Sequence, residues 1–223
     1  MKLRYLGHSA FQIVSSSGTE IVIDPFLDNN PLAPFKSHQV SADYIIITHA
    51  HGDHIGDALK IAETGKTTFV CVSELAGMLA NQGHKTHAMQ IGGAFTFPFG
   101  RLKLVPALHG SMTPDGRYAG LAAGVVLSID GKCIYHCGDT GLFGDMRLIG
   151  EMFDVDYMLV PIGGNYTMDI GDAIYAVRMI HPKIAIPMHY NTFDLIRADP
   201  ESFAKQVKEH GYSTQVLSPG DWV

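Results

Sequence analysis

The strongest constraint on this chain is the run His49-Ala50-His51-Gly52-Asp53-His54, which directly follows an apolar segment, residues 44–48. The run places three imidazoles and one carboxylate within six residues. Such groups cannot all find hydrogen-bond partners in a dry interior, so burying them together costs free energy unless a cation accepts their lone pairs. A fold that contains this run therefore needs a metal site where the apolar segment ends.

The spacing within the run agrees with this interpretation. In an extended backbone the side chains of His49 and His51 lie on the same side, because residues two apart share one face of a strand. Gly52 permits an abrupt turn, so Asp53 and His54 can point toward a second position just before a helix. The alternative is a surface loop that is merely rich in histidine, and the flanking strand and helix argue against it.

Apolar and alternating runs predict a β core with helices between the strands. Strands are predicted over residues 2–6, 10–14, 19–23, 44–48, 67–72, 94–97, 101–106, 121–129, 132–136, 155–160 and 184–187. Helices are predicted over residues 74–81, 169–180 and 202–210. A further helix is expected to begin near Ile55 and to bury Ile55, Leu59 and Ala62. Asp130-Gly131 predicts a hairpin turn.

Residues with polar or metal-binding side chains close several of these strands. They are Asp24, His49, His109, Asp139 and His189. In a core of two packed sheets, helices would cover both outer faces and the strand ends would meet at one edge, where loops can form a pocket. The pattern therefore predicts that these side chains gather at that edge.

The run at 49–54 resembles the HxHxDH signature of the metallo-β-lactamase superfamily. Other parts of the chain are similar to that family in the same order: Asp24 after 20–23, His109 before Gly110, Asp139 in Cys-Gly-Asp-Thr, and His189 in Pro-Met-His-Tyr. The resemblance covers almost the whole chain. It implies a four-layer αββα sandwich of the α/β (α+β) class, formed by a single hydrolase domain over residues 1–223.

The resemblance also implies a binuclear metal centre. The ligands that it implies are His49, His51 and His109 for one ion and Asp53, His54 and His189 for the other, with Asp139 bridging the two. Asp24 is similar to a strand-end aspartate that accepts a hydrogen bond from a ligand imidazole. The alternative for Asp24 is a turn residue before Pro25.

These ligand types are typical of a catalytic metal site, because the set contains imidazoles and carboxylates but no thiolate. Two divalent ions that share a carboxylate lie about 3.5 to 4 Å apart and lower the pKa of a shared solvent molecule toward neutrality. We expect zinc first, with manganese, nickel or iron as alternatives. His51 stands where the iron-using flavodiiron proteins of the family have glutamate, which favours a hydrolase over an oxygen-reducing electron carrier.

The hypothesis that follows is a metal-dependent hydrolase in which a metal-bridged hydroxide attacks an ester, lactone, amide or phosphodiester bond of a small molecule. Asp53 would be catalytic as well as a ligand, because it can share the proton of that hydroxide. A narrower alternative is a phosphodiesterase or a hydrolase of phosphorylated lactones. An alternative from another class is a metal- or ligand-binding sensor without turnover.

His8 is a further candidate, because it lies in a tight turn beside Gly7 between two predicted strands. This segment is similar to the Gly-His-Ser element of a subgroup of metal-dependent hydrolases related to ascorbate-phosphate lactonase and to the N-acylphosphatidylethanolamine phospholipase. There the histidine lies near the metal pocket. Our hypothesis is that His8 binds substrate or donates a proton to the leaving group. The alternative is a structural turn residue.

The segment 161–168 is a candidate for substrate binding. It contains two glycines, whose backbone N–H groups can approach an anionic oxygen. Asn165 would add a hydrogen-bond donor, and Tyr166 would stack on the substrate or bond to it. The alternative is a loop that leads into the next helix, with Thr167 or Asp169 as its cap.

Composition limits the partners of this chain. Its 223 residues, 46% of them hydrophobic, are enough for one sizeable core. The formal net charge is −6 and the basic residues are scattered, so we expect a small-molecule substrate and no nucleic acid.

The sequence also predicts where the protein is located and how it could assemble. No apolar run has the length of a membrane span and no signal-peptide core is visible, which predicts a cytoplasmic protein without membrane contact. A β-lactam-directed enzyme is disfavoured for the same reason. The three cysteines lack CxxC spacing and are expected to be reduced. The apolar residues of the loop 26–35 would suit either a subunit contact in a homo-oligomer or a lid.

Overall fold

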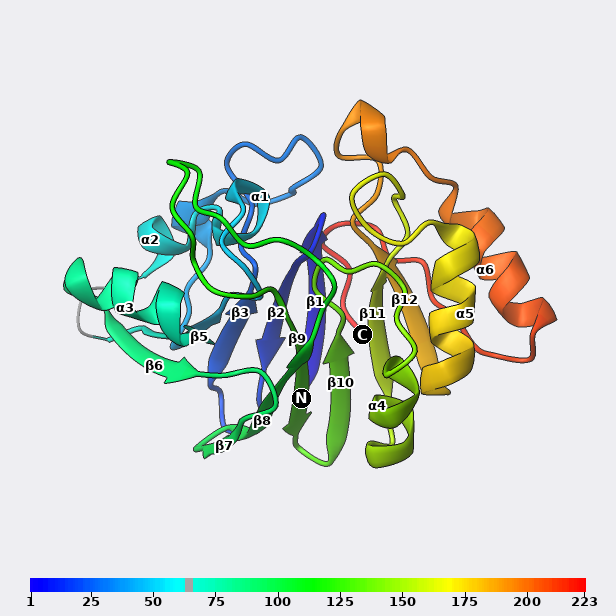
Figure 1. Cartoon of the computed structure of the whole chain (residues 1–223), viewed down its shortest axis with the longest axis horizontal. Coiled ribbons are helices and arrows are strands. Elements are labelled where there is room, and N and C mark those ends of the chain that lie inside the picture. The colour runs from blue at the N-terminus through cyan, green and yellow to red at the C-terminus, as the bar shows by residue number, and fades with distance from the viewer. Residues whose placement is uncertain (63–65) are drawn as a thin grey trace.

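The structure, a computed structural model, describes residues 1–62 and 66–223, whose strands form two six-stranded sheets (Figure 1). The first sheet has the order β1 (Lys2–Gly7), β2 (Ala10–Val14), β3 (Glu20–Ile23), β4 (Tyr44–Ile46), β5 (Thr68–Val72) and β6 (Lys85–Met89). The second has the order β12 (Ile184–Met188), β11 (Tyr157–Pro161), β10 (Lys132–His136), β9 (Ala123–Ile129), β8 (Gly100–Pro106) and β7 (Ala94–Phe97).

Helices cover the outer sides of the two sheets. The first sheet carries α1 (Gly52–Ile55), α2 (Ala58–Ile61) and α3 (Ser73–Asn81), and the second carries α4 (Met146–Met152), α5 (Ile170–Ile180) and α6 (Pro200–Glu209). Short 3-10 helices are η1 (Ser37–Gln39) and η2 (Asp194–Ile196). The predicted αββα sandwich is confirmed. Within the described residues, no helix is both long enough and apolar enough to cross a bilayer.

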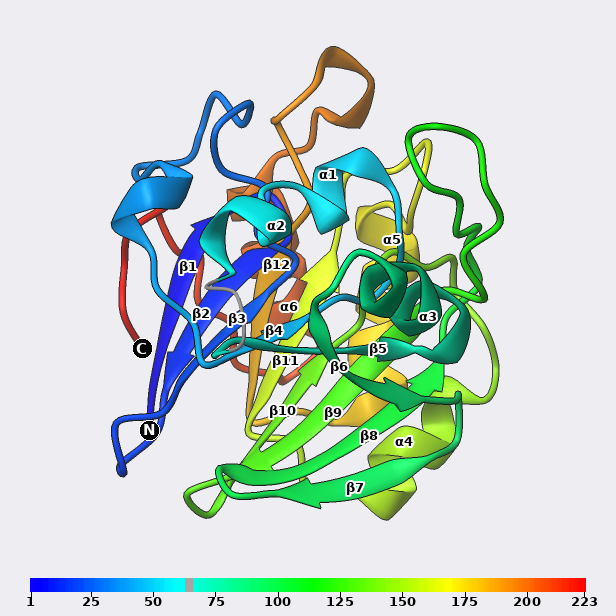
Figure 2. The same cartoon turned by 90° about the vertical axis from the view of Figure 1, so that its left-hand side faces the viewer.

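The two sheets share one pattern of strand direction. The first three strands of the chain are antiparallel, and β3 to β6 run parallel. In the second sheet β7 to β10 are antiparallel, whereas β10, β11 and β12 run parallel. The carboxyl ends of parallel strands meet at one edge of a sheet, where connecting loops form crevices. Figure 2 shows loops that follow β3, β8 and β12 at the same upper end of the molecule.

The core lies between the sheets and beneath the helices. Ile21, Val22 and Ile23 of β3 are all fully buried, although successive residues of a strand point to opposite faces. This is the pattern of a sheet that is covered on both sides, and it explains why the strands read as continuous apolar runs. The three cysteines are buried and unpaired, as the sequence predicts.

The long helix predicted from Ile55 is wrong, because the chain forms two short helices with a break at Gly56. Gly56 has φ 43° and ψ −121°, and a Cβ at this position would lie 2.4 Å from the carbonyl oxygen of Pro25. The next residue, Asp57, donates its N–H to that same oxygen over 2.8 Å. The break lets the loop after β3 pack against this segment, and it leaves Leu59 exposed.

Two elements were not predicted, namely β6 and α4. β6 is an edge strand in which only Met89 is buried, and its sequence Lys-Thr-His-Ala-Met has no apolar alternation for a pattern to detect. α4 has only seven residues and contains Gly150. The predicted hairpin turn is confirmed, since Asp130 and Gly131 have φ 51° and 74° and join the antiparallel strands β9 and β10.

Gly150 marks a close approach of α4 to α5, where a Cβ would lie 2.5 Å from the carbonyl oxygen of Met179. We predict that Gly150→Ala lowers the free energy of unfolding by about 1–3 kcal/mol, because the helices must move apart. Gly77→Ala on α3 is the matched control, since its Cβ would meet no described atom within 4 Å. It should raise stability by up to about 1 kcal/mol. Urea titration measures both changes, and equal stabilities would contradict the close approach.

Candidate metal centre

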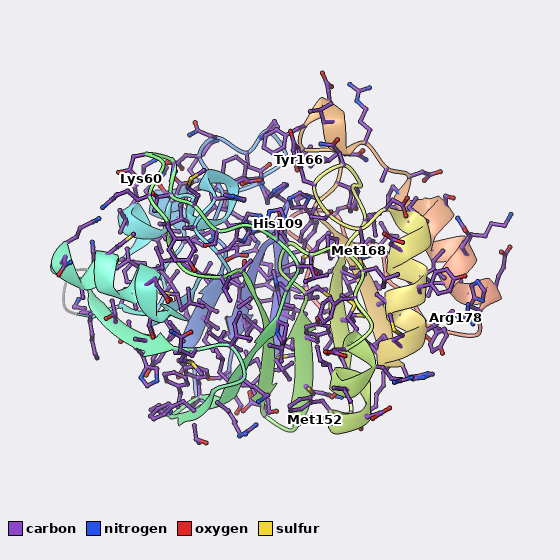
Figure 3. The ribbon with its side chains drawn as sticks, viewed as in Figure 1. Lys60, His109, Met152, Tyr166, Met168 and Arg178 are labelled. Carbon is purple, nitrogen blue, oxygen red and sulfur yellow. The ribbon has the colours of Figure 1, made fainter. Side chains whose placement is uncertain are left out.

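Loops from both sheets bring the predicted residues to one end of the sandwich. Asp24 follows β3, the run 49–54 follows β4 and forms α1, and three single residues follow strands of the second sheet, namely His109, Asp139 and His189. Figure 3 shows His109 and Tyr166 at this end, whereas Met152 lies at the opposite end. All seven residues that the resemblance implies as ligands therefore lie together.

The first group of possible ligands contains His49, His51 and His109. One ring nitrogen from each lies within 4.8 Å of the other two. Nδ1 of His51 is 3.0 Å from Nε2 of His49 and 3.2 Å from Nε2 of His109. Three imidazoles from two loops, and from two different sheets, thus converge on one point that a single cation can occupy.

The second group contains Asp53, His54 and His189, and His8 lies with them, again with one ligand atom of each within 4.8 Å of the others. Asp139 stands between the two groups. Its Oδ1 is 3.2 Å from Nε2 of His54, and its Oδ2 is 3.1 Å from Nε2 of His189. The same Oδ2 is 3.5 Å from Nε2 of His109 in the first group.

Unpaired buried atoms in the second group fit a cation. Nε2 of His54, both ring nitrogens of His189 and Oδ1 of Asp139 are buried without a hydrogen-bond partner among the described residues. The 3.2 Å contact between His54 and Asp139 therefore lacks the geometry of a hydrogen bond. Each orphaned group costs about 1–3 kcal/mol in a dry interior. A divalent cation would satisfy these lone pairs together, so the residues present fit a metal ion.

The protonation states suit such a site. Burial lowers the pKa of His49 and of His109, so both rings are neutral near pH 7 and keep a free lone pair. Burial also acts to lower the pKa of His54, but the charges of Asp139 and Asp24 outweigh it and raise this pKa well above its usual value. For Asp139, burial acts to raise the pKa, and the neighbouring histidines bring it well below the ordinary range. The negative charge in this cluster attracts a proton or a metal ion.

Asp24 and Thr48 orient the imidazoles. Asp24 accepts hydrogen bonds from the Thr48 N–H (2.8 Å), the Thr48 hydroxyl (2.6 Å) and Nδ1 of His54 (2.8 Å). Because the Thr48 hydroxyl donates to Asp24, its oxygen accepts from Nδ1 of His49, 3.0 Å away. His49 then directs a bare Nε2 into the site, and His54 presents its Nε2 there to a proton or to a metal ion. Thr48 was not predicted, and its position directly before His49 at a strand end was the available signal.

His8 is fully buried beside Asp53. Its Nε2 lies 3.1 Å from Oδ2 of Asp53, and its Nδ1 lies 2.9 Å from Oγ1 of Thr192. Burial lowers the pKa of His8 to about 4, so the ring carries one proton near pH 7. Since the carboxylate of Asp53 can only accept, that proton is on Nε2 and the Thr192 hydroxyl donates to Nδ1. Thr192 lies three residues after His189, and no pattern in the sequence singled it out.

A cavity of about 610 Å³ opens beside these residues. Its lining includes polar residues, among them Asp53, His109, Asp139 and His189, and also apolar side chains. Of the predicted substrate residues, Tyr166 lines this cavity and Asn165 is exposed outside it. The capping alternative is also realised, because Asp169 accepts a hydrogen bond from the N–H of Asp172 at the start of α5.

Comparison with known proteins agrees with this geometry. The model of a family described as the β-lactamase superfamily domain matches residues 19–190. The chain belongs to this superfamily. Its relatives include UPF0173 metal-dependent hydrolases from Carboxydothermus hydrogenoformans, 47% identical over all of this chain and 99% of the relative, and from Thermus thermophilus, 47% identical over 99% and 97%. The chain is therefore a metal-dependent hydrolase of the metallo-β-lactamase type.

Solved structures lead to the same conclusion. Igni18, a metallo hydrolase from Ignicoccus hospitalis, is 40% identical and superposes with a TM-score of 0.91 over 100% of this chain and 97% of the other. An isothiocyanate hydrolase from Delia radicum gut bacteria has a TM-score of 0.80 over 100% and 98%. At 18% identity, that second likeness shows the shared fold alone.

Asp24→Asn tests the orientation of the imidazoles. One amide of similar shape cannot accept from all three donors, so we predict a loss of metal affinity of about 10- to 100-fold. Asp57→Asn is the matched control, because Asp57 is also buried and accepts from the N–H groups of Leu27 and Asp28. It should lose stability but keep its metal affinity. Metal titration against a competing chelator measures the difference, and wild-type affinity in Asp24→Asn would refute the role of Asp24.

Proposed function

We propose that this protein is a binuclear metal-dependent hydrolase that cleaves an ester, lactone or amide bond in a small molecule. The observation that supports two ions is the placement of Asp139. Its carboxylate contacts His109 of the first group as well as His54 and His189 of the second, at 3.1 to 3.5 Å. A carboxylate shared in this way suits two cations about 3.5 to 4 Å apart.

The proposed ligands follow from the two groups. One ion is held by His49, His51 and His109, the other by Asp53, His54 and His189, with Asp139 shared. Imidazole and carboxylate ligands without a thiolate favour zinc, with manganese, nickel or iron as alternatives. When bound, the two ions supply a Lewis acid and an activated water molecule as the nucleophile.

Asp53 is positioned to accept a proton from the water molecule that acts as the nucleophile. It lines the cavity, and its Oδ2 accepts a hydrogen bond from His8. Burial acts to raise the pKa of Asp53, but the hydrogen bond from His8 and the charges of His54 and His8 together bring the pKa well below the usual range. The carboxylate is therefore ionised near pH 7 and can accept a proton during attack on the substrate.

The cavity favours carboxylic esters, lactones and amides over phosphodiesters as substrates. Among the described residues that line it, none is Lys or Arg, which are the residues that pair with phosphate oxygens. We therefore expect hydrolysis of p-nitrophenyl esters and little hydrolysis of bis-p-nitrophenyl phosphate. We further propose that the protein acts on a small molecule in the cytoplasm and binds neither nucleic acid nor membranes. It would be either a monomer or a homo-oligomer.

The experiment that tests this function is elemental analysis followed by an ester and amide panel with each metal restored. We predict two bound metal equivalents and a fall in kcat/KM of at least about 100-fold for Asp139→Asn, because both ions lose a shared ligand. Asp156→Asn is the matched control, since Asp156 is a buried carboxylate beside β11 that accepts from the Cys133 N–H. Full activity with one equivalent would overturn the binuclear site.

His8 is proposed as a positioning residue that acts through Asp53. Its side chain is fully buried and does not line the cavity among the described residues, so this role replaces direct proton donation in our proposal. The hydroxyl of Thr192 contacts Nδ1 of His8 and orients the ring, and the N–H at Nε2 of His8 then holds one oxygen of Asp53. The other oxygen of Asp53 is left for the metal.

Thr192→Val and Thr192→Ser form a matched pair that tests this chain of hydrogen bonds. We predict that the valine variant loses about tenfold in affinity for one of the two metal equivalents, because the ring of His8 is no longer oriented toward Asp53. The serine variant keeps the hydroxyl and should retain wild-type affinity. Stepwise metal titration separates the two equivalents, and identical titrations for both variants would refute the role of Thr192.

A further inference from the structure

We propose that the apolar side chains that line the cavity form a subsite for an uncharged, apolar group of the substrate, aliphatic or aromatic, next to the bond that is cleaved. This inference rests on the proposed hydrolytic function and narrows its substrate class. The subsite consists of Phe26, Tyr166, Phe193 and Leu195, which all line the cavity.

These four side chains come from three loops that are far apart in sequence. Phe26 follows β3, Tyr166 lies between β11 and α5, and Phe193 and Leu195 follow β12. The ring centroids of Phe26 and Phe193 are 6.2 Å apart. Both rings also pack edge-on against His8, with centroid distances of 5.7 and 5.5 Å. The aromatic wall therefore stands directly beside the His8 and Asp53 pair.

The exposure of this wall points to a ligand. Phe193 is 40% exposed, Tyr166 52% and Leu195 64%, so large apolar surfaces face water at one opening. Such exposure is unfavourable, and apolar surface gathered beside polar groups is typical of a binding site. A substrate group that covers these side chains would recover the lost hydrophobic free energy.

The charges of the cavity decide which group fits there. The described residues that line it include the carboxylates of Asp53 and Asp139 but no Lys or Arg, and Asn29 is the neutral amide among them. A carboxylate or phosphate on this side of the substrate would find no ion-pair partner on the wall. A neutral apolar group needs no ion-pair partner, and it gains van der Waals contact with the apolar side chains. A volume of about 610 Å³ is also in the range of small-molecule sites.

A series of p-nitrophenyl acetate, butyrate and hexanoate tests the subsite with the metal-loaded protein. We expect kcat/KM to rise about two- to fourfold for each added methylene that is buried. Mono-p-nitrophenyl succinate, which carries a carboxylate on a chain like that of butyrate, should be at least about tenfold poorer than butyrate. A flat series, or a succinate ester as good as butyrate, would overturn the proposal.

Variants locate the effect on the wall. Phe193→Ala and Leu195→Asn should flatten the chain-length series, and the second variant alters a side chain so exposed that folding is not at risk. Leu148→Ala is the matched control, because Leu148 is an exposed leucine on α4 and outside the described lining of the cavity. An unchanged series in both wall variants would place the selectivity elsewhere and refute the subsite.

A binding measurement separates this inference from the proposed function. Calorimetry with acetohydroxamate and hexanohydroxamate reports the subsite without turnover, and the longer chain should bind at least about tenfold more tightly to wild type than to Phe193→Ala. If no ester or amide is hydrolysed but this difference is found, the proposed reaction fails and the subsite stands. If esters are hydrolysed and both hydroxamates bind equally, the subsite fails alone.

Discussion

The carboxylate of Asp139 is the group on which the rest of the site depends. It is almost fully buried, and its two oxygens face imidazoles from three different loops. A buried negative charge in such surroundings is tolerated only with a cation close by, so this carboxylate and the histidines around it require one another. Because His54 comes from the first sheet and His109 and His189 come from the second, the requirement also couples the site to the packing of the two sheets.

Backbone strain concentrates at the same place. His8, Asp24 and His189 have φ values of 57°, 46° and 54°, a region that residues other than glycine rarely adopt. Each such residue costs about 1–3 kcal/mol, which surrounding contacts must offset. The N–H of His189 donates to the carbonyl of His8 over 2.8 Å, and the N–H of Asp24 donates to Ile46 over 3.1 Å. Tertiary hydrogen bonds thus hold in place turns that local preference disfavours.

Two threonines complete the arrangement from opposite sides. Thr48 links Asp24 to His49, while Thr192 fixes His8 beside Asp53. In each case a carboxylate determines which ring nitrogen of the histidine carries the proton, and the hydroxyl orients the ring. The rings of Phe26 and Phe193 pack edge-on against the fully buried ring of His8, where the low dielectric strengthens electrostatic interactions.

Most of the fold could be predicted from the sequence because it depends on local patterns, whereas the candidate ligand set was implied by the resemblance to the metallo-β-lactamase superfamily. Apolar strands that end in Asp24, His49, His109, Asp139 and His189 require these side chains to share one edge once the sheets stack. Other features depend on contacts between distant segments, which no local pattern contains. The break at Gly56 arises from the approach of Pro25, and the partnership of Thr192 with His8 spans 184 positions. The apolar wall likewise exists only where three loops meet. The sequence by itself therefore determined which chemical groups are available to the centre, whereas tertiary packing decided the shape of its cavity.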